Sequence, residues 1–352
     1  MIRKILYAGS LGRGATSRYR FHALKRLGHE VIAFDVESRS AKSFLLSRLQ
    51  IRFPVGPLIE RINRELLQKV QQHSPELVWF DKPIFFNAET IRSIRRAGIY
   101  TVCYNQDNPF GPRNDPGWLQ FRRTFGLFDL HCLVRNADVV RYRAMGLNAV
   151  KTQFSFDPVQ QYPPHGGWSD MDRNREISYV GSPFEDRPQF LRTLIEQHLP
   201  VTLSGPRWNR HLSREEMRSW VRGGMLREEE YREAIWRSRI NLAFVTHHNE
   251  DDVAHKAFEI TASGGFLLAE RTPGHQAVFE EGKEAEFFSS VEECVEKCSY
   301  YLAHPLAREI IARRGCERAW SSGYDNDFQL SQILACIPET GSRAASCEVV
   351  VG

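Results

Sequence analysis

The sequence predicts an α/β protein with two doubly wound, parallel-sheet domains that face each other across a cleft. Short apolar strands alternate with amphipathic helices along most of the chain, and several helices end at a glycine. The alternation stops over residues 157–176 and then restarts, which indicates two domains. The length of 352 residues also exceeds the usual size of one hydrophobic core.

The first half opens with a strand–helix–strand unit. KILYA (4–8) is an apolar strand, GSLGRGATS (9–17) is a glycine-rich loop, and RYRFHALKRLG (18–28) is a helix that ends at a glycine. HEVIAFDV (29–36) is the next strand, and two short strands joined through a helix favour parallel pairing. The pattern continues with strands at 76–81, 99–105 and 127–134 and helices at 88–98 and 136–146.

The second half repeats this pattern after a segment rich in proline, glycine and polar residues. Strands are expected at 175–181, 200–205, 239–245 and 266–269, and helices at 187–199, 227–238, 291–321 (two in series) and 325–334. We therefore expect a Rossmann-like N-terminal domain over 1–157, a linker over 158–175 and a second Rossmann-like domain over 176–322. A helix within 323–338 is expected to cross back to the first domain, followed by a flexible tail, 339–352.

The composition is that of a globular protein, with 42% hydrophobic and 26% charged residues. No apolar run approaches the roughly 18 residues of a membrane span, and the N-terminal apolar stretch is interpreted as a strand rather than a signal peptide. The seven cysteines contain no CxxC pair, so reduced thiols and no zinc site are expected. These features predict a cytoplasmic protein.

Charge is unevenly distributed between the two halves. Residues 1–150 hold 24 Lys and Arg against 12 Asp and Glu, whereas residues 151–352 hold 23 against 31. A basic half joined to an acidic half suggests modules with different partners, and a bias toward arginine is the alternative explanation.

The glycine-rich loop gives only weak evidence for a cofactor. Its glycines follow the spacing GxxGxG rather than GxGxxG, and Ser17 stands where a dinucleotide fold needs a third glycine. The chain contains no GxxxxGK[ST] and no GxSxG motif. We therefore expect no cofactor, and we expect Gly12, Arg13 and Gly14 to form a loop at the cleft.

Residues 255–270, HKAFEITASGGFLLAE, carry the most informative pattern. Lys256 and Glu259 share one face of a largely apolar helix, so a simple surface ion pair explains them poorly. A cation and a carboxylate on a buried helix suit a nucleotide, whose phosphate and ribose they would bind. Gly264 and Gly265 are expected to let the backbone approach that ligand closely.

Other polar clusters favour surface roles. The two Asp-x-Asp segments, at 169–173 and 324–328, do not follow buried strands and are interpreted as solvated surface rather than metal sites. HHNEDD (247–252) could bind a metal but is interpreted as a polar loop at the rim of the cleft.

The stretch HKAFEITASGGFLLAERTPGHQAVFEEGKEAEFF (255–288) resembles the C-terminal domain of CgeB-like, spore-maturation-type glycosyltransferases of the GT-B superfamily. ISYVGSPFEDRPQFL (177–191), LSGPRW (203–208) and TVCYNQDNPF (101–110) are similar to further segments of that family. The resemblance covers roughly residues 76–320 and is strongest over 177–285.

The resemblance implies transfer of a sugar from a nucleotide-sugar donor, bound by the second domain, to an acceptor bound by the first. Glu259 would hold the ribose, Lys256 and Arg187 would face the diphosphate, and Gly181 and Ser182 would lie under the donor. Positive groups and helix N-termini would neutralise the leaving diphosphate without a metal. The base and sugar of the donor are left open.

The candidate catalytic groups differ between a retaining and an inverting enzyme. Asp251 stands where retaining relatives often carry a glutamate, with seven residues between it and Glu259, and aspartate is the shorter side chain. An inverting enzyme would instead need a general base from the first domain, for which Asp107 is the candidate and Asp115 a less favoured one. Retention and inversion both stay open.

The partners follow from the resemblance and the charge. We expect a glycan or lipid-linked acceptor, anionic if the basic half binds it, with peripheral contact at the inner membrane surface and no nucleic acid. The alternatives are an inactive nucleotide- or sugar-binding protein, an epimerase of the same fold, and a nucleic-acid-binding module that uses the basic half.

Overall fold

The computed structural model describes residues 3–41, 43–111, 116–166 and 168–338. The chain forms two compact units. Unit 1 comprises Met1–Gln153, His248–Glu250 and Asn326–Gly352, and unit 2 comprises Phe154–His247 and Asp251–Asp325. Within the described residues, no helix combines the length and the apolar character needed to cross a membrane. The expected tail, 339–352, and the candidate base Asp115 lie outside the described residues.

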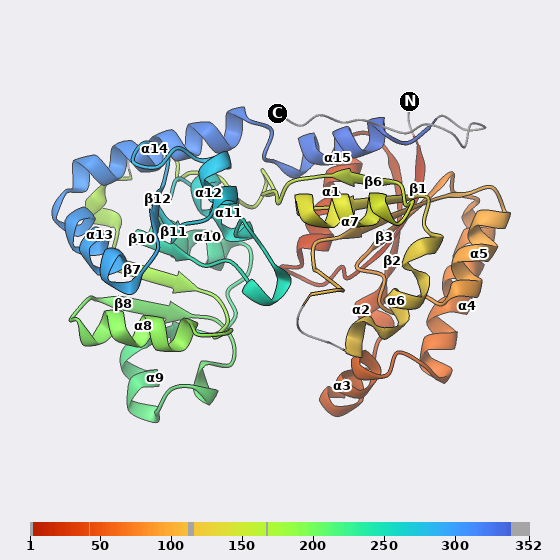
Figure 1. Cartoon of the computed structure of the whole chain (residues 1–352), viewed down its shortest axis with the longest axis horizontal. Coiled ribbons are helices and arrows are strands. Elements are labelled where there is room, and N and C mark those ends of the chain that lie inside the picture. The colour runs from red at the N-terminus through yellow and green to blue at the C-terminus, as the bar shows by residue number, and fades with distance from the viewer. Residues whose placement is uncertain (1–2, 42, 112–115, 167, 339–352) are drawn as a thin grey trace. The chain divides into compact units, whose positions relative to one another are not determined.

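Unit 1 is a six-stranded parallel sheet in the order β2-β1-β3-β4-β5-β6, covered by helices (Figure 1). Its strands are β1 (Lys4–Gly9), β2 (Glu30–Asp35), β3 (Leu77–Asp81), β4 (Tyr100–Asn105), β5 (Leu130–Leu133) and β6 (Ala149–Lys151). Its helices are α1 (Thr16–Arg26), α2 (Val36–Arg39), α3 (Phe44–Arg52), α4 (Pro57–His73), α5 (Ala88–Arg96), η1 (Pro116–Trp118), α6 (Leu119–Thr124), η2 (Phe125–Leu127), α7 (Asn136–Ala144) and α15 (Asn326–Ala335).

Both faces of this sheet are buried, as in other parallel sheets covered by helices. Along β1, Ile5 and Tyr7 face one apolar cluster, which includes residues of α1 and α15, and Leu6 and Ala8 face a second cluster, which includes residues of α4 and α5. The last described helix, α15, packs against α1 and therefore completes the core of unit 1, although the chain reaches it only after all of unit 2.

Unit 2 is a second six-stranded parallel sheet, in the order β12-β11-β10-β7-β8-β9. Its strands are β7 (Arg175–Val180), β8 (Val201–Ser204), β9 (Val221–Gly223), β10 (Ser238–Ala243), β11 (Leu267–Glu270) and β12 (Glu286–Phe288). Its helices are η3 (Asp170–Asp172), α8 (Arg187–Glu196), η4 (Trp208–Arg210), α9 (Arg214–Trp220), α10 (Glu229–Trp236), η5 (His247–Asn249, mostly within unit 1), α11 (His255–Ala262), α12 (Pro273–Val278), α13 (Val291–Ala303) and α14 (Pro305–Ser321).

The prediction of two doubly wound α/β sheets is confirmed. The strands β6, β9 and β12 were not predicted, because three residues are too short to show an alternating pattern. In unit 2 the chain builds β7, β8 and β9 outward in one direction and then returns to place β10 on the other side of β7. This reversal between β7 and β10 is the position at which doubly wound sheets bind ligands, beyond the carboxyl ends of the strands.

Candidate functional site

The reversal in unit 2 brings together the loops that follow β7 and β10. Arg187, the first residue of α8, is buried at this junction. Its guanidinium donates to the Val245 carbonyl (2.7 Å), the Thr246 hydroxyl (3.2 Å) and the Tyr179 hydroxyl (3.2 Å). Its Nε atom is buried and has no hydrogen-bond acceptor within the described residues. The structure shows that Arg187 joins the two loops, and its role in facing a diphosphate stays a prediction.

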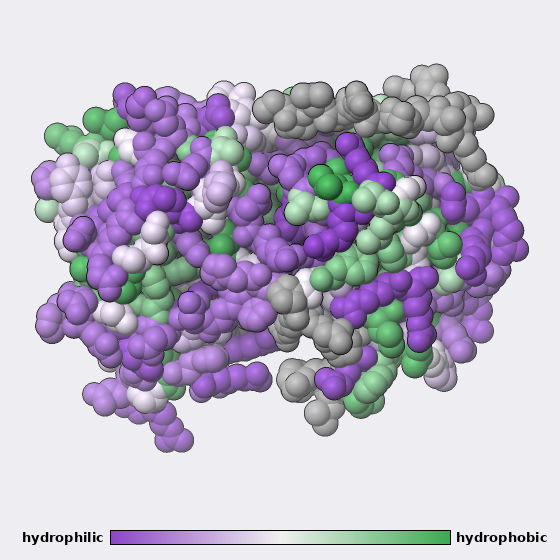
Figure 2. Space-filling view, in the orientation of Figure 1, coloured by the Kyte–Doolittle hydropathy of each residue, from purple (hydrophilic) through white to green (hydrophobic). Residues whose placement is uncertain are grey.

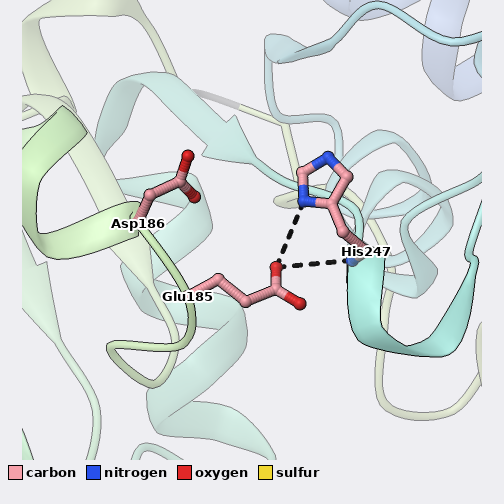
Figure 3. A group of neighbouring side chains, drawn as sticks. All are labelled: Glu185, Asp186 and His247. Carbon is pink, nitrogen blue, oxygen red and sulfur yellow. Dashed lines mark hydrogen bonds and ion pairs between the residues drawn. The ribbon is translucent and has the colours of Figure 1, made fainter. Parts of the chain in front are cut away.

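His247 lies beside the Glu185 carboxylate (Figure 3) and also contacts Glu270. Glu185, from the loop after β7, accepts from the backbone N–H of His247 and lies 3.2 Å from Nδ1 of the His247 ring. Glu270, at the end of β11, lies 2.8 Å from Nε2 of the same ring. Burial lowers the pKa of His247, but the two carboxylates outweigh that effect and raise the pKa above its ordinary value. When both ring nitrogens of His247 are protonated, the ring can donate one hydrogen bond to each carboxylate.

Glu185, Asp186 and His247 could also hold a metal ion, because one ligand atom from each lies within 4.8 Å of the others. Figure 3 shows the Glu185 carboxylate directed at His247 and the Asp186 carboxylate standing apart from both. The hydrogen bonds of His247 with Glu185 and Glu270 account for this arrangement without an ion.

The helix α11 begins at the same edge of the sheet, because it follows β10 and its loop. Its N-cap residue, Ala254, offers no side-chain acceptor, and a cation, Lys256, lies in its first turn. A cation at the positive end of a helix dipole is unfavourable unless an anion binds there. Burial lowers the pKa of the Lys256 ammonium, the charge of Arg187 lowers it further, and Glu259 opposes both.

Lys256 and Glu259 do not form an ion pair within the described residues; instead, Tyr231 of α10 contacts both. The Lys256 ammonium lies 4.7 Å from the centre of the Tyr231 ring, and the Tyr231 hydroxyl donates to Glu259 at 2.9 Å. Glu259 is 8% exposed, and one of its oxygens lies 4.0 Å from His255. The Tyr231 hydroxyl therefore fixes the orientation of a nearly buried carboxylate.

The Thr-Pro-Gly segment fixes the start of α11. The buried imidazole of His275 donates from Nδ1 to the Glu270 carbonyl (2.7 Å) and accepts at Nε2 from the Ala254 N–H (2.9 Å). This pairing needs a neutral ring, and burial lowers the His275 pKa to about 4. A Cβ on Gly274 would lie 2.4 Å from the Asp252 carbonyl, so only glycine allows this close packing.

Gly181 and Ser182 lie directly after β7, at the carboxyl edge. A Cβ on Gly181 would lie 2.5 Å from the Tyr179 hydroxyl, and a Cβ on Gly205, in the loop after β8, would lie 2.1 Å from the Gly181 carbonyl. The glycines let these two loops pack closely. The Ser182 carbonyl accepts from the Tyr179 hydroxyl at 3.1 Å, so the backbone of this loop is held in place.

Gly264 and Gly265 lie elsewhere, and their predicted role is wrong. They follow α11 and precede β11, which places them at the amino edge of the sheet, opposite the loops after β7 and β10. A Cβ on Gly265 would lie 2.6 Å from Ile235 and 2.9 Å from Asn241, and one on Gly264 would lie 3.1 Å from Pro163. Because protein atoms fill the space beside both glycines, the absence of a side chain there allows close packing and leaves no room for a donor.

Asp251 lies in the loop between β10 and α11 and is partly buried. Its backbone N–H donates to the Thr246 carbonyl at 3.2 Å. The structure thus places Asp251 in the loop that carries His247, and its predicted role stays a prediction.

Unit 1 contains a cavity of about 530 Å³ beyond the carboxyl ends of β1 and β3. Its polar lining includes two ion pairs, Arg20–Asp81 (2.7 Å) and Lys82–Asp107 (2.5 Å). The first pair is buried, and the Tyr7 hydroxyl also donates to Asp81 at 2.6 Å. Because each lining cation is matched by a carboxylate, the cavity offers no net positive charge to an anion.

Asp107 is poorly suited to the predicted role of general base. Burial raises its pKa, but the charge and hydrogen bond of Lys82, with help from Arg135 and Asn249, outweigh burial and hold the pKa below its ordinary value. A carboxylate stabilised in its ionised form accepts a proton weakly. Glu37, which also lines the cavity, has no cation within ion-pair distance among the described residues and accepts from the Ser10 hydroxyl.

The glycine-rich loop borders this cavity without lining it. Ser10 and Ala15 contribute to the wall, whereas the predicted residues Gly12, Arg13 and Gly14 lie between them in the chain and outside the wall. A Cβ on Gly12 would lie 2.4 Å from a carboxylate oxygen of Glu37, so this glycine makes room for the Glu37 side chain.

Several residues of the two sites were not predicted. Asp81 was recognisable, since it ends a predicted strand, and Glu270 directly follows another. Tyr231, His275 and Glu185 had no signal in the sequence, because they meet their partners only through the packing of separate loops and helices.

Residues 187–335 match the family model described as glycosyl transferase-like. This segment begins at Arg187 and includes Lys256 and Glu259. No curated protein sequence is significantly similar to the chain.

Solved structures share the fold over nearly the whole chain. HepE from Anabaena, in complex with UDP and glucose, is 14% identical, with a TM-score of 0.65 over 95% of this chain and 100% of that chain. Sucrose-phosphate synthase from Thermosynechococcus elongatus is 10% identical, with a TM-score of 0.68 over 95% and 98%. A protein assigned as a UDP-N-acetylglucosamine 2-epimerase from Listeria monocytogenes is 13% identical, with a TM-score of 0.55 over 99% of both chains.

At these identities the structural likeness is one of fold, and that fold is the GT-B type. Over residues 187–335 the chain is therefore similar both in fold and in sequence to glycosyl transferase-like proteins.

The packing role of Gly265 can be tested directly. Gly265→Ala should destabilise unit 2 by about 1–3 kcal/mol, because the added methyl overlaps Ile235. Gly224→Ala is the matched control, since a Cβ there meets nothing within 4 Å. Urea denaturation measures both. Unchanged stability with loss of nucleotide binding would instead support the original prediction for Gly265.

Acid should weaken unit 2 through His275. Its folded-state pKa of about 4 lies below the ordinary value of 6.5, so the unfolded chain binds the proton more readily, and stability falls as the pH drops from 6.5 toward 4. At about 1.4 kcal/mol per pH unit, the loss approaches roughly 3 kcal/mol. In urea denaturation at several pH values, His275→Gln should reduce this slope, and the exposed-site control His211→Gln should keep it. Equal slopes in all three proteins would contradict this assignment.

Proposed function

We propose that the chain transfers a sugar from a nucleotide-sugar donor, bound by unit 2, to an acceptor bound by unit 1. The observation that carries this proposal is the grouping of Arg187, Lys256 and the buried Glu259 at the carboxyl edge of the unit 2 sheet. Lys256, Arg187 (3.9 Å from Glu185) and the oriented carboxylate of Glu259 match a diphosphate and a ribose in hydrogen-bonding character. The match of this segment to a glycosyl transferase-like model supports the same assignment.

In this proposal Glu259 accepts hydrogen bonds from the ribose hydroxyls. The hydrogen bond from Tyr231 leaves the other Glu259 oxygen available for the ribose. Lys256 binds the diphosphate, because a bound anion offsets the cost of burying the Lys256 charge and the repulsion between Lys256 and Arg187. Arg187 contributes positive charge and holds the loops after β7 and β10, with Gly181 and Ser182 beside it.

UDP is the first nucleotide to test. HepE was solved with UDP, with UDP-glucose, and with UDP and glucose, and MnaA of S. aureus was solved with UDP. These proteins share the fold of this chain, and the extension of their ligand to it is part of the proposal.

We propose that the leaving diphosphate is neutralised by Lys256, Arg187 and the N-terminus of α11. A cation held by Glu185, Asp186 and His247 is the alternative. Nucleotide binding that persists in a chelator favours the first arrangement, and binding that needs a divalent metal favours the second.

The acceptor is proposed to enter the unit 1 cavity and to present a hydroxyl there. The paired charges of the cavity favour an acceptor group without a phosphate or carboxylate of its own, so an anionic part of the acceptor would lie outside the cavity. Glu37 is a better candidate than Asp107 for a general base, because Lys82 does not neutralise it. A role of Asp251 at the sugar is a further part of the proposal.

The CgeB-like subtype is also a proposal. It rests on the motif over 255–288, in which Gly274 and His275 carry a structural role that the fold explains. An epimerase is the second candidate, because the Listeria protein shares the fold over 99% of both chains. Transfer to an acceptor with release of nucleotide distinguishes the two.

The donor site makes a direct prediction for UDP. UDP at a hundredfold excess over its Kd should stabilise the protein by about 2.7 kcal/mol, which appears as a rise in the melting temperature. Glu259→Gln and Lys256→Met should each weaken UDP binding by roughly tenfold or more, since each removes a charged contact. Lys283→Met, at an exposed lysine outside the site, is the control and should keep the shift.

Two results would count against the donor site. If UDP, GDP, dTDP and CMP all leave the melting temperature unchanged, the proposed site binds no nucleotide. If Lys283→Met loses the shift as fully as Lys256→Met does, the nucleotide binds somewhere else. A panel of UDP-sugars with measured UDP release then separates an active enzyme from an inactive binding protein.

A further inference from the structure

The helix α3 of unit 1 has an inverted distribution of polar and apolar residues. In α3 and the turn after it, the side chains of Leu46, Leu49, Ile51, Phe53 and Val55 are 58%, 53%, 43%, 54% and 61% exposed. Gln50 is instead buried, and its side chain accepts from the Ala41 N–H at 2.8 Å. The next helix, α4, shows the ordinary pattern, with Ile59, Ile62, Leu66 and Val70 buried.

These five exposed side chains, here called the α3 apolar surface, lie within ten residues. Isolated exposed apolar residues are normal in globular proteins, but a contiguous group marks an interaction site. Figure 1 places α3 at one end of unit 1, and Figure 2 shows hydrophobic surface in that region.

The charge of the same segment indicates what kind of partner it binds. Residues 38–59 contain four basic residues, Arg39, Lys42, Arg48 and Arg52, and no aspartate or glutamate. The guanidinium of Arg52 lies 5.9 Å from the centre of the Phe53 ring, so a cation and an apolar group are presented side by side. Apolar side chains among basic ones, with no acidic residue between them, are typical of segments that lie in the interface of an anionic membrane.

The segment also contributes to the cavity of unit 1. Ile51 is 43% exposed and lines the cavity together with Arg20, Asp81 and Phe85. A molecule that reaches the cavity past Ile51 therefore passes the α3 apolar surface.

We propose that the α3 apolar surface binds a phospholipid membrane with anionic headgroups. The side chains of Leu46, Leu49, Phe53 and Val55 enter the acyl boundary, and Arg52 contacts the headgroups. Membrane binding by itself does not depend on the proposed transferase function. Where that function holds, the surface brings the cavity next to lipid-borne acceptors.

A second copy of this chain is a poorer partner for this surface. Two such segments facing each other would bring like charge together, since the sequence of each carries four basic residues and no acidic one, and of these four Arg39 is paired with Glu65. Anionic lipid supplies the missing negative charge and an apolar layer together. Self-association is therefore one of the outcomes that the experiment below distinguishes.

Vesicle sedimentation with the full chain tests the proposal. The protein should bind vesicles of phosphatidylcholine mixed with phosphatidylglycerol and should bind pure phosphatidylcholine vesicles at least about tenfold more weakly. The double variant Leu49→Glu/Phe53→Glu should lose at least about tenfold in binding, because two apolar anchors become charged. Raising the salt to about 0.5 M should weaken binding by screening the headgroups.

Val140→Glu is the matched control, since Val140 is 69% exposed on α7 of the same unit and lies outside the surface. It should bind vesicles as the wild type does. The melting-temperature shift with UDP, measured on the same variants, reports the donor site separately and should be unchanged in all of them.

Three results would overturn the proposal. The wild type could fail to bind the anionic vesicles, or the double variant could bind them as well as Val140→Glu does. Light scattering could instead show a dimer that the double variant disrupts, without vesicle binding, in which case the surface joins two copies. Loss of the UDP shift alone would count against the proposed function and would leave the membrane proposal standing.

Discussion

The candidate donor site depends on one buried guanidinium. Arg187 begins α8, immediately after the loop from β7, and its donors reach the Val245 carbonyl and the Thr246 hydroxyl in the loop after β10. These are the two loops that the reversal of strand order brings together. Arg187 is buried, lies 3.9 Å from the Glu185 carboxylate and lowers the pKa of Lys256, so one side chain both holds the two loops together and adds a cation to the site.

The two units differ in how closely their cations are paired. In unit 2 Glu185 lies 3.9 Å from Arg187, and the charge of Arg187 lowers the pKa of Lys256 while Glu259 raises it. In unit 1 the cavity cations Arg20 and Lys82 are each paired with a carboxylate, so the excess of basic residues in the first half does not gather in the cavity. Part of that excess lies in residues 38–59, whose sequence has four basic residues and no acidic one, and of these Arg39 is paired with Glu65.

The sequence was sufficient for those features that depend on local pattern. Alternating strands and helices predicted both sheets, and the spacing of Lys256 and Glu259 placed them on one face of α11. It misjudged Gly264 and Gly265, because a glycine pair before a strand looks the same whether ligand or protein fills the adjacent space; here Ile235 and Asn241 fill it. Tyr231 and His275 were missed, since each meets its partner only through tertiary packing. The exposure of the apolar side chains of α3 was not predicted either, because an amphipathic segment does not reveal which of its faces is exposed.

The central claim is that a nucleotide binds at the carboxyl edge of the unit 2 sheet. Hydrogen–deuterium exchange with and without UDP tests it most directly, because bound ligand slows exchange at the backbone amides that it covers or orders. The account predicts slower exchange in residues 181–187 and 254–259, and unchanged exchange in the glycine-rich loop, 9–17, of unit 1. Protection confined to residues 9–17, with none in unit 2, would contradict it.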